Sequence, residues 1–402
     1  MAKPTIRFRG FDDEWEQRKL GELVGIYDGV HQTPEYQDSG IMFLSVENIA
    51  TLKSEKYISE EAFERDYKVY PEKGDILMTR IGDVGTTNVV ETAEKVAFYV
   101  SLALLKPNGI DAYFLSNAMK TNVFQKGLRE RTLVTAIPQK INKDEIGKID
   151  IFITNNDEEQ QKIGAYFSNL DHLITLHQRK CDETKKLKKY MLQKMFPQNG
   201  SKVPEIRFKG FTDEWEQRKL IEVCDYVDYR GKTPTKTEDG IFLVTAKNVK
   251  DGFIDYETSK EYISENAYEE VMRRGKPEIG DVLITTEAPC GNVAQVNKAD
   301  IALAQRIIKY RGHIGVVDNT YLKHYLLSPE FQKILNAKSS GGTVQGIKGS
   351  ILHQQKIIYP SYEEQKKIGQ HMDSLDNLIT LHQHKCEELK KLKKFMLQNM
   401  FI

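Results

Sequence analysis

The sequence predicts an α/β (α+β) protein in which two mixed α/β domains are joined by two long antiparallel coiled-coil helices. Two internal matches predict this pseudo-two-fold tandem repeat. Residues 4–20 read PTIRFRGFDDEWEQRKL, and residues 204–220 read PEIRFKGFTDEWEQRKL. Residues 158–196 and 363–401 form a second matched pair, in which 27 of 39 positions are identical. Long segments that recur at a nearly fixed offset indicate a repeated structural unit.

The second matched pair is expected to form the two long helices. Apolar or small residues recur in it at alternating steps of three and four, without an interrupting proline, which is typical of a heptad seam. Each helix is expected to be roughly 60 Å long at 1.5 Å per residue, so that the pair makes a rod with a variable block at each end. The seam of one copy needs a partner, and the other copy is the obvious one. The predicted helix–helix interface consists of Ile163, Phe167, Leu170, Ile174, His177 and Cys181 in one copy and Ile368, Met372, Leu375, Ile379, His382 and Cys386 in the other.

The expected segments are therefore a first domain at 1–156, a central helix at 157–198, a second domain at 199–360 and a final helix at 361–402. Between the shared segments only a sparse common skeleton survives. It consists of Thr33-Pro34 with Thr233-Pro234, Asn48 with Asn248, Gly74-Asp75 and Thr79 with Gly280-Asp281 and Thr285, and 124–126 with 331–333. This alternation suggests that the shared segments have the same structural role in both halves, whereas the divergent blocks recognise two different ligands.

Local patterns place the elements of the two variable blocks. Apolar runs predict strands at 41–46, 74–79, 241–246 and 280–285. Helices are expected at 111–130 and 319–337. Polar or glycine-rich stretches predict turns at 81–88, 287–292 and 339–349.

Composition narrows the class of protein. The 58 basic and 58 acidic residues give no net charge, which counts mildly against a generic nucleic-acid binder, although the position of the charge matters more than its sum. The four cysteines form no CxxC pair, so no disulfide framework or redox motif is indicated. No apolar run is long enough to cross a membrane and no secretory segment is visible, so we expect no membrane association and a cytoplasmic location in a bacterium or archaeon.

No catalytic motif is found in the sequence. Gly231-Lys232-Thr233 resembles part of a phosphate-binding loop, but that motif needs a glycine where Tyr226 stands. The GxGxxG, HExxH and GxSxG motifs are missing, as is the Asn/Asp-Pro-Pro-aromatic tetrad with which an adenine methyltransferase grips its target amine. We therefore expect no catalytic centre in this chain.

Two features of the long helices allow a functional and an ordinary interpretation. His177 and Cys181, and likewise His382 and Cys386, are four residues apart and could supply a Cys2His2 zinc site if the helices crossed there. Packing in the helix seam is favoured, because this spacing arises easily by accident, so no metal is expected. The lysine runs at 185–189 and 390–394 suit either a phosphate contact or a solvated helix end, and the solvated end is favoured.

Polar residues at turn positions are the candidates for recognition of DNA. Arg reads guanine and Asn or Gln reads adenine in bidentate geometry, whereas Thr, Lys and backbone amides hold phosphates. The candidates cluster at matching repeat positions. They are His31, Thr33, Thr79, Arg80, Thr86, Thr87 and Asn88 in the first block, and Arg230, Lys232, Thr233, Thr285, Thr286, Glu287, Asn292, Gln305, Arg306 and Lys348 in the second.

Taken together, these motifs resemble the specificity subunit of a Type I restriction-modification system. The resemblance rests on the RFxGFxDEWEQRKL segments at 7–20 and 207–220, the GKTP loop at 231–234, the GDxLxT strand at 280–285, and the EEQxKI start of a helix ending in KKLKKxML. It covers essentially the whole chain. The first half departs from the pattern at Gln32, where the second half has Lys232, so a lysine–phosphate contact cannot be carried over there.

The resemblance implies two target-recognition domains, each reading one half of a bipartite site in double-stranded DNA. It implies that the helical pair sets the spacer and docks two methyltransferase subunits, and that motor-nuclease subunits join them. AdoMet, ATP and magnesium then belong to those partners and not to this chain. Two other functions stay open on the residues alone: a tandem-repeat scaffold whose heads bind proteins, and an enzyme with an unrecognised site.

Overall fold

The computed structural model describes residues 3–229, 231, 234–341 and 345–402. The chain divides into two compact units, which we call the first unit (Met1–His177 with His384–Ile402) and the second unit (Gln178–Gln383). The two boundaries fall inside the two long helices. Each helix is thus shared between the units, whereas the sequence boundaries at 157–198 and 361–402 set the helices apart as segments of their own.

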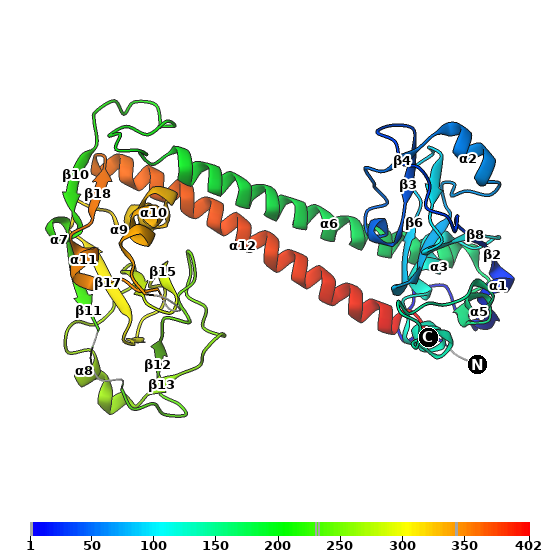
Figure 1. Cartoon of the computed structure of the whole chain (residues 1–402). Coiled ribbons are helices and arrows are strands. Elements are labelled where there is room, and N and C mark those ends of the chain that lie inside the picture. Colours follow the sequence, from blue (N-terminus) through cyan, green and yellow to red (C-terminus); the bar gives the residue numbers. More distant parts are fainter. Residues whose placement is uncertain (1–2, 230, 232–233, 342–344) are drawn as a thin grey trace. The chain divides into compact units, whose positions relative to one another are not determined.

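The first unit is built on an antiparallel sheet in the order β2-β8-β5-β6, beside a smaller sheet β4-β3-β7 and a two-stranded ribbon β1-β9 (Figure 1). Its strands are β1 Glu16–Lys19, β2 Val24–Asp28, β3 Ile41–Leu44, β4 Tyr57–Ile58, β5 Ile76–Ile81, β6 Asp83–Val89, β7 Val96–Phe98, β8 Leu102–Pro107 and β9 Asp150–Ile153. Its helices are α1 Leu20–Leu23, η1 Val46–Asn48, α2 Glu60–Asp66, α3 Ala112–Ala118, α4 Asn122–Arg131 and α5 Lys143–Gly147.

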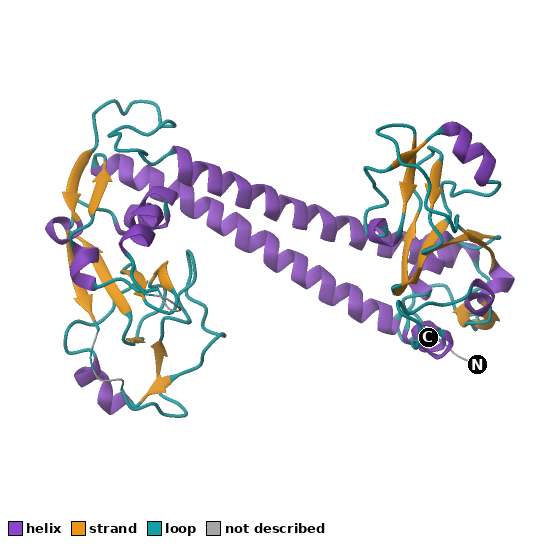
Figure 2. Ribbon diagram, viewed as in Figure 1, coloured by secondary structure: helices purple, strands orange, loops and turns teal. Residues whose placement is uncertain are grey.

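The second unit repeats this topology, with sheets β11-β17-β14-β15, β13-β12-β16 and β10-β18. Its strands are β10 Glu216–Lys219, β11 Cys224–Asp228, β12 Ile241–Val244, β13 Tyr262–Ile263, β14 Val282–Thr286, β15 Cys290–Gln295, β16 Ala302–Leu303, β17 Ile307–Gly312 and β18 Lys356–Tyr359. Its helices are α7 Leu220–Val223, η2 Glu265–Ala267, α8 Tyr268–Val271, α9 Asn319–Leu327, α10 Pro329–Lys338 and α11 Gly349–His353. Helices α9 and α10 lie against the main sheet on the side of the long helices (Figure 2).

The long helices are α6 Asp157–Lys194 and α12 Tyr362–Asn399. They run antiparallel within each unit. In the first unit Lys393 pairs with Asp171, and in the second Lys188 pairs with Asp376. The predicted fold class is confirmed: two repeated mixed α/β blocks and a helical pair.

Most positions of the predicted seam are buried. Ile163, Phe167 and Leu170 lie in the main core of the first unit, together with Met400 and Phe401 from the other end of the chain. The equivalent residues Ile368, Met372 and Leu375 lie in the core of the second unit with Met195 and Phe196. Ile174, Ile379, His177 and His382 are half-buried, and Cys181 and Cys386 are buried. The ends of the helices thus fill the cores of the α/β blocks as well as contacting each other.

Three predictions of local structure need correction. The stretch 111–130 forms two helices separated at Thr121, because that residue is the N-cap of α4. The stretch 319–337 is likewise divided by Ser328, whose hydroxyl caps α10 ahead of Pro329. Residues 83–88 of the predicted turn at 81–88 belong to strand β6, which pairs with β5 across a register shift, and residues 290–292 of the predicted turn at 287–292 belong likewise to strand β15.

A buried ion pair fastens each RFxGF segment to the start of a long helix. Arg7 makes a bidentate contact with Glu159, at 2.5 Å from Nε to Oε1 and 2.8 Å from Nη2 to Oε2. Arg207 and Glu364 repeat it at 2.7 and 2.8 Å. Both carboxylates are fully buried. The hydrogen bond to Glu159 raises the pKa of Arg7 above its ordinary value, so the guanidinium stays charged.

The glutamine that follows each glutamate fixes the next element. Gln160 accepts a hydrogen bond from the Asp111 amide and donates one to the Thr154 carbonyl. Gln365 accepts from the Asp318 amide and donates to the carbonyls of Val316 and Pro360. The EEQ motif is therefore a structural joint: it connects the start of each long helix to the next element of its block.

None of the described helices combines the length and the apolar character needed to cross a bilayer.

Replacing the buried glutamate should unfold its unit at lower denaturant concentration. Glu159→Gln leaves the Arg7 charge buried without its counter-ion, and we expect a loss of about 3–5 kcal/mol in the free energy of unfolding. Urea unfolding followed by circular dichroism measures it. Glu158→Gln is the control, because this neighbouring carboxylate is exposed and its pair with Lys162 should contribute less than about 1 kcal/mol. If both substitutions lowered the free energy of unfolding equally, the stabilising role of the Arg7–Glu159 pair would be contradicted.

Candidate nucleic-acid interface

Five of the residues predicted to recognise DNA come together in the second unit. Thr286, Glu287, Gln305, Arg306 and Lys348 line one surface hollow of about 430 Å³, together with Ser340, Gly346 and Ile347. Arg306 and Lys348 are exposed, and Glu287 and Gln305 are half-buried. This is a polar groove with a guanidinium, a carboxylate, an amide and an ammonium group within reach of one ligand.

The end of strand β14 builds this groove. The Thr286 amide donates to the Arg306 carbonyl at 2.9 Å, and the Ile347 amide donates to the Thr286 carbonyl at 2.9 Å. Arg306 has a φ of +72°, in the left-handed region that is unfavourable for residues other than glycine. Its Nε lies 3.3 Å from the Glu287 carboxylate, and both side chains are nearly half exposed. A non-glycine residue held in this conformation is typical of a functional position, because the surrounding bonds must maintain it.

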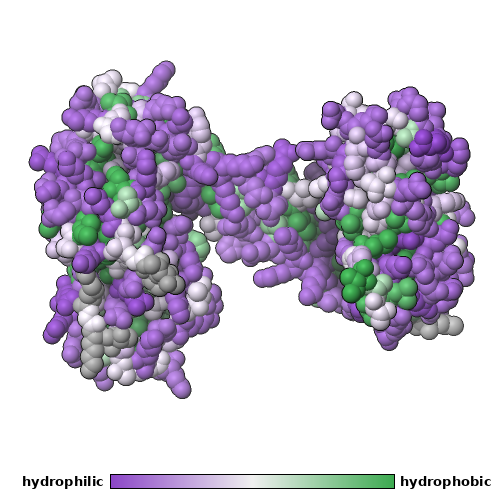
Figure 3. All heavy atoms as spheres, in the orientation of Figure 1, coloured by the Kyte–Doolittle hydropathy of each residue, from purple (hydrophilic) through white to green (hydrophobic). Residues whose placement is uncertain are grey.

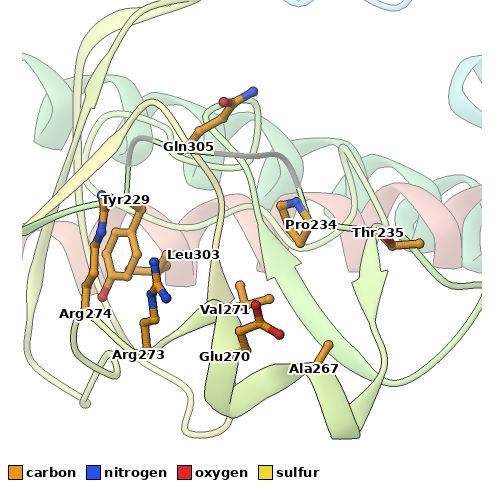
Figure 4. Close-up of a pocket in the computed structure, with 11 residues that line it drawn as sticks. Tyr229, Pro234, Thr235, Ala267, Glu270, Val271, Arg273, Arg274, Leu303 and Gln305 are labelled. Atoms are coloured by element: carbon orange, nitrogen blue, oxygen red, sulfur yellow. The ribbon is translucent and has the colours of Figure 1, made fainter.

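A second hollow of about 350 Å³ begins on the other side of Gln305. It is lined by Tyr229, Arg273, Arg274 and Glu270, among others (Figure 4). The Tyr229 hydroxyl donates to the Gly275 carbonyl, and Arg274 Nη1 donates to the Asp228 carbonyl at 2.8 Å. We did not expect Arg273 and Arg274 at this surface from the sequence. The signal that marks them is the adjacent pair of arginines directly before Gly275, at the end of a short helix.

Two predicted contacts of the second unit have structural roles. The Thr285 side chain is fully buried, and its hydroxyl accepts a hydrogen bond from the Asn292 amide at 3.0 Å. Asn292 in turn donates from Nδ2 to the Val249 carbonyl. The prediction that Thr285 contacts DNA is therefore wrong for this conformation, and Asn292 fastens a loop to the sheet. Arg230, Lys232 and Thr233 lie outside the described residues.

The first unit exposes only part of its predicted set. His31, Thr33 and Thr86 are exposed, as a contact with a ligand requires. Thr79 is fully buried and accepts a hydrogen bond from the Thr86 amide, which repeats the Thr285–Asn292 bond. Since this bond occurs in both units at the register shift of the central strand pair, the repeated threonine is a feature of the scaffold.

Two further residues of the first unit are also turned inward. The Thr87 hydroxyl is buried and lies 2.9 Å from the Ser116 hydroxyl. Asn88 donates from Nδ2 to the Ile49 carbonyl. Their roles as DNA contacts, like that of Thr79, are not supported.

Arg80 is the main correction in the first unit. Its side chain is buried and forms an ion pair with Asp28. By strand register Arg80 takes the place of Thr286, because the Arg80 amide donates to the Ser101 carbonyl as the Thr286 amide does to Arg306. At this backbone position the first unit thus has the buried, ion-paired Arg80. The second unit has Thr286, whose amide is bonded to the exposed Arg306. A direct contact of Arg80 with a base is not available in this structure.

The lysine runs and cysteines of the long helices are partly explained by packing. The half-buried Lys188 and Lys393 make the ion pairs between the helices described above, and their lysine neighbours are exposed. Cys181 Sγ lies 3.9 Å from the Ile379 carbonyl and Cys386 Sγ lies 3.9 Å from the Ile174 carbonyl. These contacts are those of seam residues.

One cluster of metal-type ligands occurs among the described residues. His324, Asp373 and Asp376 bring their ligand atoms within 4.8 Å of one another. Lys323 is bonded to Asp373 and Lys188 to Asp376, so two ammonium groups already neutralise the two carboxylates. Among the described residues Asp376 Oδ2 and His324 Nδ1 are buried without a hydrogen-bond partner, but the two ammonium groups already offset both carboxylate charges. We assign the cluster to the packing of α9 against the long helices.

Comparison with known proteins agrees with this architecture. The family model described as "Type I restriction modification DNA specificity domain" matches residues 12–186 and 212–391. The MjaVIII Type I restriction enzyme specificity subunit of Methanocaldococcus jannaschii is 24% identical over 95% of this chain and 91% of its own length. The putative MjaX specificity subunit of the same organism is 22% identical over the same shares. The crystal structure of a Type I restriction-modification system S subunit from M. genitalium superposes with a TM-score of 0.69 at 14% identity, covering 100% of this chain and 99% of that one.

The buried histidine of the cluster predicts an acid-sensitive second unit. Burial, helped by Lys323, lowers the pKa of His324 to about 4, against the opposing effect of its hydrogen bond to Asp373. Between pH 6.5 and about 4 the unfolded chain therefore binds a proton that the folded unit does not, and the free energy of unfolding falls as the pH falls. One pKa unit corresponds to about 1.4 kcal/mol, so the total loss should be about 3 kcal/mol.

Thermal melting of the full chain across this pH range measures the effect. His324→Asn is the matched variant, because Asn117 occupies the equivalent position of the first unit. It should remove most of the pH dependence of the second unit's transition between pH 6.5 and 4. An unchanged pH dependence in this variant would show that another group is responsible.

Proposed function

Because the chain belongs to the Type I restriction modification DNA specificity domain family, we propose that it reads a bipartite DNA site, one half-site with each unit. The observation that carries this proposal is a common scaffold with different side chains at matched backbone positions, of which only Arg306 is exposed. The second unit has Thr286 and Arg306 where strand register places Arg80 and Ser101 in the first. Two heads with the same backbone and different chemistry are suited to reading two different sequences.

The groove of the second unit has the chemistry of base recognition. The Arg306 guanidinium can donate two hydrogen bonds to guanine, the Gln305 amide fits adenine, and the Glu287 carboxylate accepts from the cytosine amino group. Lys348 at the rim is suited to a phosphate. The ion pair with Glu287 holds Arg306 in place before DNA arrives, which reduces the conformational entropy lost on binding.

We assign the spacing of the two half-sites to the helical pair. Both α6 and α12 cross from one unit to the other without a break in the helix. A helix changes length only by whole residues, at about 1.5 Å each. The number of helical residues between the units therefore sets the length of the spacer that is skipped.

Exposed apolar residues on the long helices support docking of two copies of one partner. In the first unit these include Leu173, Leu392 and Phe395, and in the second Leu378, Leu187 and Tyr190, whereas Leu381 is exposed in the second unit and its counterpart Leu176 is half-buried. The three positions correspond pairwise in the repeat. Figure 3 shows that the visible surface is mainly hydrophilic, so that exposed apolar side chains stand out. Such side chains on a polar surface are typical of protein interfaces.

We propose that these surfaces bind two methyltransferase subunits and that motor-nuclease subunits join the assembly. AdoMet, ATP and magnesium would bind to those partners, which would also carry the catalytic groups. This chain would supply the sequence preference of the methylation and cleavage reactions.

Methylation mapping tests the proposed function. DNA from cells that express this chain with a cognate methyltransferase subunit is sequenced for modified adenines. We expect an asymmetric split motif with modified adenines on opposite strands, on either side of a fixed spacer. An active methyltransferase without such a motif would contradict the proposal and favour a protein-binding scaffold.

Arg306→Ala should weaken recognition of one half-site only. Loss of a bidentate arginine–guanine contact costs about 1–3 kcal/mol of discrimination at that base pair. Binding to duplexes that carry single changes in either half-site measures this, with the mapped site as reference. The half-site read by the first unit is the internal control, and an equal loss at both half-sites would argue against a direct base contact.

Lengthening both helices should lengthen the recognised spacer. Four residues inserted after Leu176 and four after Leu381, which are equivalent positions, add about 6 Å, or about two base pairs. Methylation mapping should show unchanged half-sites and a longer spacer. The same insertion at 198–201, in the exposed connection that follows α6, is the control and should leave the spacer unchanged. Altered half-sites with an unaltered spacer would refute the assignment.

A further inference from the structure

The first unit contains a hollow lined by lysines that the proposed base contacts do not use. It lies between the start of α4 and the last turns of α12 and has a volume of about 450 Å³. We call it the lysine pocket. Its charged lining consists of Lys120, Lys390, Lys393 and Lys394.

The positive charge of the lysine pocket is only partly neutralised. Lys393 Nζ is bonded to both oxygens of Asp171, at 2.5 and 2.7 Å. Among the described residues, Lys120, Lys390 and Lys394 have no ion-pair partner, and no acidic side chain lines the pocket. Burial, followed by repulsion from Lys393, lowers the pKa of Lys120 to about 8. An anion in this hollow would relieve both effects.

The backbone at the pocket adds hydrogen-bond donors. Thr121 is the N-cap of α4, but its hydroxyl donates to the Ala118 carbonyl and caps no amide of the helix. The first amides of the ten-residue helix α4 therefore have no side-chain acceptor, and Asn122 and Val123 line the pocket. Free amides at the start of a helix, together with lysines, are suited to a phosphate group.

The equivalent hollow of the second unit serves as an internal comparison. It keeps Lys185, Lys188 and Lys189 from the repeated run, but Leu327 replaces Lys120 and Asp251 adds a carboxylate. Pro329 stands in place of Asn122 and has no amide hydrogen, while the Ser328 hydroxyl accepts from the Phe331 amide. Each change lowers the affinity for an anion. The difference shows that the lysine pocket is not a by-product of the repeated helix.

We propose that the lysine pocket binds a phosphate group of the DNA backbone and so anchors the first unit beside its half-site. The inference rests on the proposed function, because it takes DNA as the source of the phosphate. Charge complementarity selects this occupant: the hollow offers lysine ammonium groups and the first backbone amides of α4, and none of the side chains that line it is a carboxylate. Such a contact fixes position and carries no sequence information.

The test is binding of the full chain to a random-sequence DNA duplex over about 50–200 mM salt. Lys120→Leu, which introduces the residue of the second unit, should lower the affinity several-fold and reduce the salt slope by about one. Lys126→Leu is its control, because Lys126 is exposed on the same helix. Lys394→Gln should act like Lys120→Leu, whereas the repeat-matched Lys189→Gln should leave the slope unchanged.

The stability of the same variants separates a binding role from misfolding. Removing a partly buried charge that Lys393 repels should raise the melting temperature of Lys120→Leu while its affinity for DNA falls. If Lys394→Gln and Lys189→Gln lowered the affinity for DNA equally, the proposed phosphate site would be wrong. Binding would then depend on the general positive charge of the surface. Unchanged DNA binding in Lys120→Leu would overturn it as well.

A phosphate arm distinguishes failure of the inference from failure of the proposed function. If the wild-type chain bound no DNA, alone or with its partners, the proposed function would fail first. Inorganic phosphate, at constant ionic strength, would then be tested for a rise in melting temperature that Lys120→Leu abolishes. If the melting temperature rose in this way and the chain bound no DNA, the phosphate that fills the pocket would be free phosphate and not a group of the DNA backbone.

Discussion

The pairing of Arg7 with Glu159, and of Arg207 with Glu364, is the interaction on which the arrangement of each unit depends. It ties a segment that enters the block before its first strand to the first turn of a long helix, with both carboxylates fully buried. A buried carboxylate without its guanidinium costs several kcal/mol, so the pair permits few alternatives. Gln160 and Gln365 then fix the next helix from the adjacent position. One local cluster therefore sets the direction in which a 38-residue helix leaves its block.

Several positions of the sparse skeleton shared by the two variable blocks have a structural reason. Asn48 and Asn248 accept hydrogen bonds from backbone amides three residues earlier and donate to the carbonyls of Lys53 and Asp255, respectively. Asp75 and Asp281 close the turn before the central strand. Since the scaffold needs only these residues, the remaining surface is free to diverge. That freedom lets one fold carry two different recognition chemistries.

The helices could be predicted from the sequence because a heptad pattern is local and repeats many times. The order of the short strands, and the identity of the site, could not be predicted equally well. From the sequence, Thr79 and Arg80 look like exposed contact residues, yet both lie on β5. At the register shift of this strand the Thr79 hydroxyl accepts a hydrogen bond from the Thr86 amide, and the buried Arg80 guanidinium pairs with Asp28. Both outcomes depend on partners distant in sequence. Conversely, Gln305 and Arg306 were identified through their chemistry alone, and only the fold brings them to Glu287 and Lys348.

The two units differ in where they keep their positive charge, which explains how a chain without net charge can bind DNA. In the second unit an arginine stands beside a carboxylate at a groove edge, a pairing that favours discrimination between bases over attraction. In the first unit Ser101 stands at the position of Arg306, Arg80 is buried against Asp28, and unneutralised lysines gather at the junction of α4 and α12. Attraction to phosphate falls with salt, whereas a directional base contact is far less sensitive to it. A division of this kind lets overall affinity be adjusted in one unit without altering the sequence read by the other.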